Sequence, residues 1–299
     1  TAFPQLTENY TMVTEFIILG LTEDPTLCAI FFVVFLGIYV ATILGNISII
    51  LLIHRSPQLH TPMYVFLSHL AFVDIGYSTS VTPIMIVSFL RERTTIPVAG
   101  CVAQLGSDVI FGTAECFLLA AMANDRCVAI CCPLLYSTHM SSRVCIILLA
   151  ASYLGGCVNA SSFTGCLLSL TFCGPNKINH FFCDLPPLVK LSCTHIYVAE
   201  ISPAILAGSI IVVTLFIIAV SYLCILHSVL NMHSPEGRHK PPPQCAVTLL
   251  LWNGHVLVYV IPKAVTWLIP MLNPLIYSLR NKEVKEAMRK LMARRHWLF

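Results

Sequence analysis

Long apolar segments constrain this chain more than any other feature, because each is long enough to cross a lipid bilayer. A helical span needs about 20 apolar residues, since the hydrocarbon core is about 30 Å thick and a helix rises about 1.5 Å per residue. The segments lack the alternating pattern of barrel strands, which favours helices. They lie at residues 28–53, 62–90, 98–131, 144–170, 196–229, 243–261 and 263–279. The sequence therefore predicts an all-α membrane protein with a bundle of seven transmembrane helices.

Composition supports an integral membrane protein. Hydrophobic residues make up 57% of the 299 residues, and charged residues only 10%. A soluble domain of this size needs more charge to cover its surface. The first residues lack a basic region followed by an apolar core, so we expect the first span to act as the insertion signal. We expect the lipid bilayer as a partner and no nucleic acid.

The distribution of basic residues predicts the orientation. With the N-terminus outside, twelve of the 17 Lys and Arg residues fall on the inner side of the membrane and five on the outer side. This excess fits the positive-inside rule. We therefore expect an extracellular segment at residues 1–27, a membrane domain at 28–279 and a cytoplasmic tail at 280–299.

The tail begins with "RNKEVKEAMRKLM", in which apolar residues recur at helical spacing between basic residues. This pattern predicts a short amphipathic helix on the anionic inner leaflet. Its apolar residues are Val284, Ala287, Met288 and Leu291.

Three sequons match the pattern for N-glycosylation. The sequon at Asn9 lies on the expected outer side, so we predict a glycan there. The sequons at Asn46 and Asn159 fall inside predicted spans, which the transferase cannot reach.

Four of the 14 cysteines are expected to face an oxidising space. Cys101 lies at the outer end of the third span, and Cys173, Cys183 and Cys193 lie in the long loop after the fourth span. That compartment favours disulfides, and four cysteines allow three pairings. A zinc site at His180-x-x-Cys183 is the less favoured alternative.

Polar residues at membrane depth are expensive and are therefore candidates for function. Asn46, Asp74, Glu115 and Asn273 fall at similar predicted depths on four different spans. Two carboxylates in one small cavity cannot both stay charged without a cation, so we expect Asp74 and Glu115 to form an internal sodium or proton site. The alternative is a static hydrogen-bonded core that holds the bundle together. We expect no other metal or cofactor.

Asp108 lies nearer the outer end of the third span and shares a helix face with Gln104 and Gly112. A carboxylate facing an outer cavity is suited to act as the counterion of a cationic ligand. The alternative is that Asp108 pairs with a neighbouring side chain or faces water. In the seventh span, Asn273-Pro274 interrupts the hydrogen-bond ladder and predicts a kink suited to switching.

Several segments carry a family resemblance, from "TEFIILGL" near the start to "RNKEVKEAM" near the end. The chain resembles the rhodopsin-like G-protein-coupled receptors and, within them, the vertebrate odorant receptors. The segments that carry the resemblance are "GN" at 45–46, "LHTPMYVFLSHLAFVD" at 59–74, "MANDRCVAICCPLLY" at 122–136, "CGPNKINHFFCDLPPLVKLSC" at 173–193, "SY" at 221–222 and "PMLNPLIYSLRN" at 270–281.

The resemblance implies a receptor of the plasma membrane that binds small, volatile odorants in its outer half. It implies activation of a stimulatory heterotrimeric G protein, cAMP signalling and no catalysis. It also implies the disulfides Cys101–Cys183 and Cys173–Cys193. We expect the ligand to contact Gln104, Asp108, Phe111, Gly112, Leu206 and Ser209. The residues expected to couple to the G protein and to switch are Asp125, Arg126, Tyr222, Asn273, Pro274 and Tyr277.

Three features depart from the family pattern. Asn124 and Cys127 stand where the family usually has tyrosines around Asp-Arg, and Pro241 to Pro243 stand where the sixth helix usually begins. Residues 243–279 must hold two spans, which need about 40 residues before any loop is counted. These features leave open a divergent, pseudogene-like receptor that couples poorly.

Functions of other classes find less support. A small-solute transporter would favour an even number of spans with repeated halves, whereas the sequence predicts seven spans and shows no repeat. The Ser, His and Asp residues form no nucleophilic or metal-binding constellation, so an enzyme is not expected.

Overall fold

The computed structural model describes residues 13–19, 22, 24–91, 93–172, 176–178, 180, 182–193, 197–231, 273, 284–287 and 289. Within these residues, five helices are long and apolar enough to cross a membrane. They begin and end within a few residues of the first five predicted spans, whereas the predicted spans at 243–261 and 263–279 lie outside the described residues apart from Asn273. The five helices are α1 (Pro25–Arg55), α2 (Pro62–Leu90), α3 (Val98–Cys131), α5 (Ser142–Leu168) and α7 (Tyr197–Asn231).

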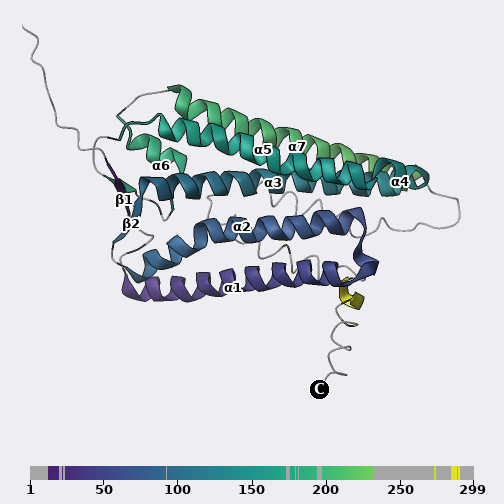
Figure 1. The fold of residues 1–299 in the computed structure, drawn as a ribbon, viewed down its shortest axis with the longest axis horizontal. Helices are drawn as coiled ribbons and strands as arrows, with labels where there is room; N and C mark the ends of the chain where they lie inside the picture. The colour runs from purple at the N-terminus through teal and green to yellow at the C-terminus, as the bar shows by residue number, and fades with distance from the viewer. Residues whose placement is uncertain are drawn as a thin grey trace, which may run out of the picture.

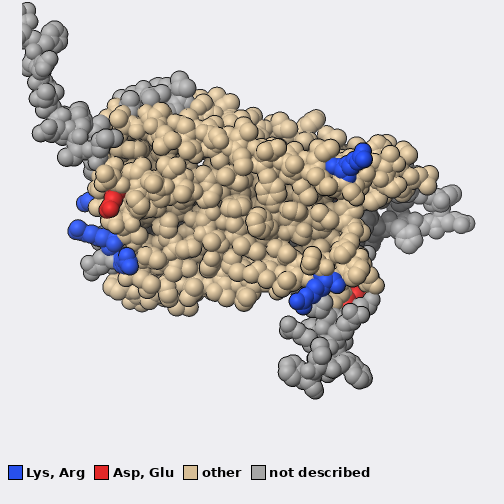
Figure 2. All heavy atoms as spheres, in the orientation of Figure 1, with Lys and Arg blue, Asp and Glu red and all other residues tan. Residues whose placement is uncertain are grey.

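The five helices run along the long axis of the molecule as a bundle (Figure 1). Helix α3 is central, because it packs against α2, α5 and α7, while α1 packs against α2. Charged side chains visible on the face in Figure 2 lie at the two ends of the bundle, and the belt between them shows none on that face. This arrangement is that of a multi-pass membrane protein, with an apolar belt in the hydrocarbon and charges at the interfaces.

Helix starts follow local sequence. Asp24 caps α1 by accepting a hydrogen bond from the Thr26 amide at 2.8 Å, and Pro25 occupies the first turn. Helix α2 likewise begins at Pro62. Proline suits a first turn because its missing amide would have no helical partner there.

One end of the bundle carries a small β-sheet, which the all-α prediction did not include. Strand β1 (Glu15–Ile18) pairs antiparallel with β2 (Thr94–Pro97) and parallel with β3 (Lys177–Ile178), in the order β2-β1-β3. The pairing satisfies backbone groups of three segments that lie far apart in the sequence. We call this the sheet end; the short helix α6 (Leu185–Lys190) lies there too (Figure 1).

The sheet is held by apolar packing on its bundle side. Phe16 and Ile18 of β1 are only 1% and 2% exposed. They belong to one buried cluster with Ile96 and Ile178 of the other strands and with both cysteines of the Cys101–Cys183 disulfide. The N-terminal strand is therefore an integral part of the sheet end.

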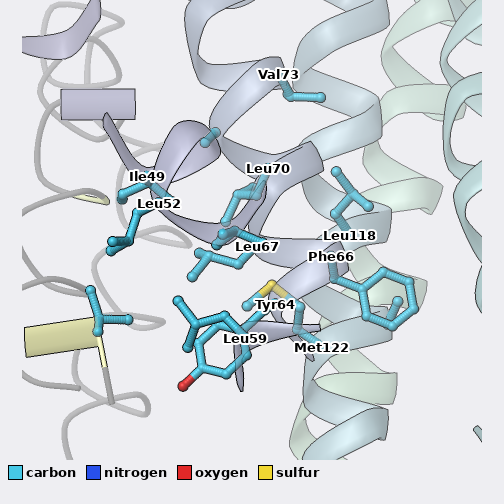
Figure 3. Close-up of a cluster of buried hydrophobic side chains, with 14 of the residues drawn as sticks. Ile49, Leu52, Leu59, Tyr64, Phe66, Leu67, Leu70, Val73, Leu118 and Met122 are labelled. Carbon is cyan, nitrogen blue, oxygen red and sulfur yellow. The ribbon is translucent and has the colours of Figure 1, made fainter. Parts of the chain in front are cut away.

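The opposite end carries the short elements η1 (Pro57–Leu59), η2 (Pro133–Leu135) and α4 (Tyr136–His139). Figure 3 shows a cluster of buried side chains where α1, α2 and α3 meet on this side of the bundle. Val284 and Ala287 belong to the same cluster, and residues 284–287 and 289 are helical. The apolar side of this tail segment thus contacts the bundle; contact of the tail with the inner leaflet stays a prediction.

Glycine permits a close approach of α3 and α5. A Cβ atom added at Gly156 would lie 2.6 Å from the backbone carbonyl oxygen of Ile110. Real Cβ atoms do not approach a backbone oxygen so closely, and small residues at helix contacts are a common device in membrane bundles. At this point the spacing of the two helices therefore depends on the missing side chain.

Substituting Gly156→Ala should destabilise the bundle, because the new methyl group meets backbone atoms that cannot move alone. We expect a loss of about 1–3 kcal/mol, seen as a lower Tm of the detergent-solubilised protein. The matched control is Gly165→Ala on the same helix, where a Cβ meets nothing within 4 Å. Equal Tm values for the two variants would contradict this account of the α3–α5 contact.

Candidate functional site

Three polar residues predicted at membrane depth meet in the middle of the bundle. Asp74 of α2 is 0% exposed, and the Asn273 amide donates a hydrogen bond to its Oδ2 at 3.0 Å. Glu115 of α3 interacts electrostatically with Asp74 and is hydrogen-bonded to Asn273. The described bond of the fourth residue, Asn46, is to the Thr42 carbonyl within α1, at 3.0 Å.

Two buried acceptors of this cluster have no partner among the side chains and backbone groups that the structure describes. Asp74 Oδ1 and Glu115 Oε1 are both buried, and neither has a hydrogen-bond partner among the described residues. A buried polar atom without a partner is rare and calls for an explanation such as a proton, a water molecule or an ion. Carboxylate and amide oxygens are the ligands that hard cations prefer. The donor set therefore fits a small hard cation or a shared proton.

Gln104, predicted to contact the ligand, is 4% exposed and uses both ends of its amide within the protein. Its Nε2 donates to the Ser80 carbonyl of α2 at 3.3 Å, and its Oε1 accepts from the Cys183 amide at 3.0 Å. Cys183 is disulfide-bonded to Cys101, the pairing that the resemblance implies. Gln104 thus joins α3 to α2 and to the loop after α5.

Phe111 also contacts α2. A Cβ added at Gly76 would lie 2.5 Å from Phe111 Cε1, so the ring lies directly on this glycine. The Phe111 ring meets Phe72 edge-on, with centroids 6.5 Å apart. On α7, Leu206 is half-buried, and the exposed Ser209 donates its hydroxyl to the Leu206 carbonyl at 2.8 Å. Ligand contact by these side chains stays a prediction.

Asp108 and Gly112 continue along α3 from Gln104, at successive steps of four residues. Asp108 is half-buried and Gly112 is buried. One step of four residues advances about 6 Å along a helix, so Asp108 lies about one turn deeper than Gln104. The counterion role of Asp108 stays a prediction.

Cys183 and Cys193, the described cysteines of the loop after α5, form disulfides and not a zinc site. Cys183 is bonded to Cys101, which removes the thiolate that the zinc alternative requires, so that alternative is wrong. Cys193 is also disulfide-bonded, and its predicted partner Cys173 lies outside the described residues. Over the described part of the chain, no group of three His, Cys, Asp or Glu residues could hold a metal ion. The glycan predicted at Asn9 lies outside the described residues.

The Asp-Arg pair lies at the end of α3 opposite the sheet. Asp125 is buried and accepts a hydrogen bond from the Tyr136 hydroxyl at 2.9 Å. Arg126 attracts Asp125 electrostatically and donates through Nη1 to the Tyr222 hydroxyl of α7 at 3.4 Å. The structure therefore brings together three of the predicted switch residues; Pro274 and Tyr277 lie outside the described residues.

Tyr136 is a neighbour of the Asp-Arg pair that the sequence did not predict. It is the last residue of the motif that carries the resemblance, but no spacing rule shows that the chain turns back on itself after α3. Burial and the neighbouring Asp125 carboxylate raise the pKa of the Tyr136 phenol, so it stays a hydrogen-bond donor.

Cys127, which replaces a family tyrosine, lies in the contact between α3 and α7. Its sulfur is 3.9 Å from the sulfur of Cys131, which accepts a hydrogen bond from Ser228 of α7 at 3.1 Å. Cys127 also packs against the buried cluster that contains Tyr222. The cysteine at position 127 thus changes the packing around the predicted switch. Asn124, the other departure from the family pattern in this motif, is exposed.

Comparison with known proteins decides the family. The family model described as olfactory receptor matches residues 35–269. The chain belongs to the olfactory receptor family. Olfactory receptor 5P4 of Mus musculus is 68% identical over 308 residues, covering 97% of this chain and 99% of that protein. Olfactory receptor 5P1 of Mus musculus is 62% identical over 96% of this chain and 98% of that protein, and olfactory receptor 5P3 of Homo sapiens is 63% identical over 95% and 97%.

Membership makes this olfactory receptor a sensory, G-protein-coupled protein and not an enzyme. The comparison also bears on length. The alignment with olfactory receptor 5P4 extends over 308 positions, more than the 299 residues of the chain. The chain therefore lacks residues that this relative has; the short segment at 243–279 stays a prediction from the sequence.

Substituting Tyr136→Phe should reduce signalling by this receptor roughly tenfold, because the Asp125 carboxylate loses a charge-assisted hydrogen bond and its hold on Arg126 strengthens. Basal and odorant-evoked second-messenger output report the effect. Tyr153→Phe is the matched control, since it also removes one described hydrogen bond, to His69 at 3.1 Å, but far from Arg126. Equal signalling by both variants would show that the Tyr136 bond has no part in coupling.

Proposed function

We propose that this olfactory receptor lies in the plasma membrane with the sheet end outside, binds a small volatile ligand in the outer half of a seven-helix bundle, and activates a stimulatory heterotrimeric G protein that raises cAMP. The observation that carries the proposal is the division of the molecule into two different ends. One end holds a disulfide-linked cap, and the other holds the Asp125-Arg126-Tyr222 group. Disulfides form in oxidising compartments, which supports the outside location of the sheet end.

At the sheet end, the proposed ligand-binding end, recognition would depend on the shape of the site and on one charged side chain. The helices below the cap are mainly apolar, which suits small apolar odorants. The half-buried Asp108 adds a carboxylate about one turn below Gln104. We propose that Asp108 is the counterion for ligands that carry an amine.

At the opposite end, the proposed coupling end, Arg126 would interact with the G protein. Its guanidinium is attracted to Asp125 on its own helix and is hydrogen-bonded to Tyr222 on α7. A cation shared between two helices changes partner when the helices shift, which is how a ligand at one end can expose it to a G protein at the other.

A second candidate is an olfactory receptor that inserts but couples poorly. Three observations favour it: Cys127 alters the packing beside Tyr222, Pro241 to Pro243 interrupt the start of the predicted sixth helix, and the chain lacks residues that olfactory receptor 5P4 has. A transporter has no comparable observation in its favour.

A cAMP assay in cells separates these candidates. We expect the wild-type receptor to respond to at least one member of an odorant panel that includes amines, and Arg126→Ala to abolish that response. Arg143→Ala, an exposed arginine at the same end, is the control and should respond as wild type. Surface expression without any response would favour the poorly coupling receptor.

The same assay tests the ligand proposal. Asp108→Asn should remove the response to amines and leave responses to uncharged odorants, because only an amine needs the carboxylate. An amine response that survives Asp108→Asn would contradict the counterion role.

We also propose that Asp74 and Glu115 hold a sodium ion or a shared proton that changes between receptor states. The proposal is supported by two buried oxygens, Asp74 Oδ1 and Glu115 Oε1, that have no hydrogen-bond partner within the described part of the chain, and by Asn273, which bridges both carboxylates. The residues that would hold the ion are Asp74 and Glu115, with Asn273 orienting them. A bound cation supplies the positive charge that two carboxylates in one dry site require.

Replacing sodium by choline at constant ionic strength should lower the Tm of the purified receptor. Sodium at ten times its dissociation constant stabilises by roughly 1.4 kcal/mol, or a few degrees in Tm. Asp74→Asn should abolish the sodium effect. A Tm that depends on pH but not on sodium would assign the site to a proton, and dependence on neither would leave a static polar core.

A further inference from the structure

One buried amide at the sheet end joins three separate parts of the chain. Gln104 of α3 accepts from the Cys183 amide at 3.0 Å and donates to the Ser80 carbonyl at 3.3 Å. We infer that Gln104 is a positioning residue for the disulfide loop, which we define as the described residues 182–193 between α5 and α7. It fixes the depth of this loop over the outer end of α3. This role differs from the ligand contact predicted from the sequence.

The contact with α2 falls at a weak point of that helix. Pro83 lies inside α2 and has no amide, so the carbonyl four residues earlier, at Thr79, lacks its usual helical donor. Ser80 is the next residue, and its carbonyl receives the Gln104 amide instead of facing only its own helix. Gln104 therefore ties the loop to α2 where proline loosens the helix.

The disulfide alone does not set the position of the loop. It joins Cys101 and Cys183 through rotatable side chains, with the two Cα atoms 5.3 Å apart. The Gln104 bond acts on the Cys183 backbone itself, and Gln104 lies three residues from Cys101, about one helical turn. Two attachments on adjacent turns of one helix fix the Cys183 backbone more firmly than the disulfide does alone.

The surroundings of Gln104 show why the Cys183 amide needs this acceptor. The Gln104 side chain is buried, and so is Cys183, whose amide donates the hydrogen bond to it. A buried backbone amide without a partner is costly, so removing the Gln104 acceptor should release the loop locally. Asp108 lies about one turn deeper along α3 than Gln104. On the proposed function, on which this role in ligand binding rests, Gln104 therefore sets the distance between the loop and the ligand.

Hydrogen exchange measured by mass spectrometry on the purified full-length receptor tests the inference without any ligand. Gln104→Met keeps the size of the side chain and removes both bonds, and should speed exchange of the peptide that contains Cys183 by about tenfold. Gln104→Glu keeps an acceptor for the Cys183 amide and should retain most of the protection. Gln58→Met, the same change at the opposite end of the bundle, is the matched control and should leave the Cys183 peptide unchanged.

Three results would overturn the inference: unchanged exchange in Gln104→Met, equal loss of protection in Gln104→Met and Gln104→Glu, or faster exchange spread equally to peptides at the opposite end. If Gln104→Met does not fold, Gln104→Glu still decides, because loss of Cys183 protection in this variant, which keeps the acceptor, would contradict the positioning role. Exchange does not depend on signalling, so a receptor that never responds to odorants in the cAMP assay leaves this test intact.

Discussion

The packing of α3 against α2 is the contact on which the rest of the structure depends. At the sheet end Gln104 of α3 bonds the Ser80 carbonyl, and midway Phe111 lies on Gly76. Deeper still, Glu115 interacts with Asp74 across the same interface. Because α3 also packs against α5 and α7, the α2–α3 contact connects α1 and α2 to the other described long helices.

The proposed ligand-binding end and the proposed coupling end of the receptor are both attached to α3. The Cys101–Cys183 disulfide anchors the cap at its start, and Asp125 binds Tyr136 near its end. A helix of 34 residues is about 50 Å long, enough to join the two faces of a membrane. The buried carboxylates Asp74 and Glu115 lie between them, within the packing that connects the two ends.

Several parts of the fold could be predicted from sequence because one physical rule governs them. The hydrocarbon thickness fixes the length of a span, and the five long helices accordingly match the first five predicted ranges within a few residues. The same rule placed Asp74, Glu115 and Asn273 at one depth, and the structure brings them together. The sheet was missed because its strands are short and lie far apart in sequence, so no local pattern marks their pairing.

The sequence by itself determined that the chain crosses a membrane, which residues carry charge at depth, and which family motifs it contains. These depend on hydropathy, helical rise and residue order, all of which are local. Only the tertiary structure decided what each side chain faces. Helical spacing put Gln104 and Asp108 on one stripe but could not say that Gln104 turns to α2 and the loop. Nor could it show that Tyr136 returns to Asp125, because a side chain acquires its partner only when separate segments pack.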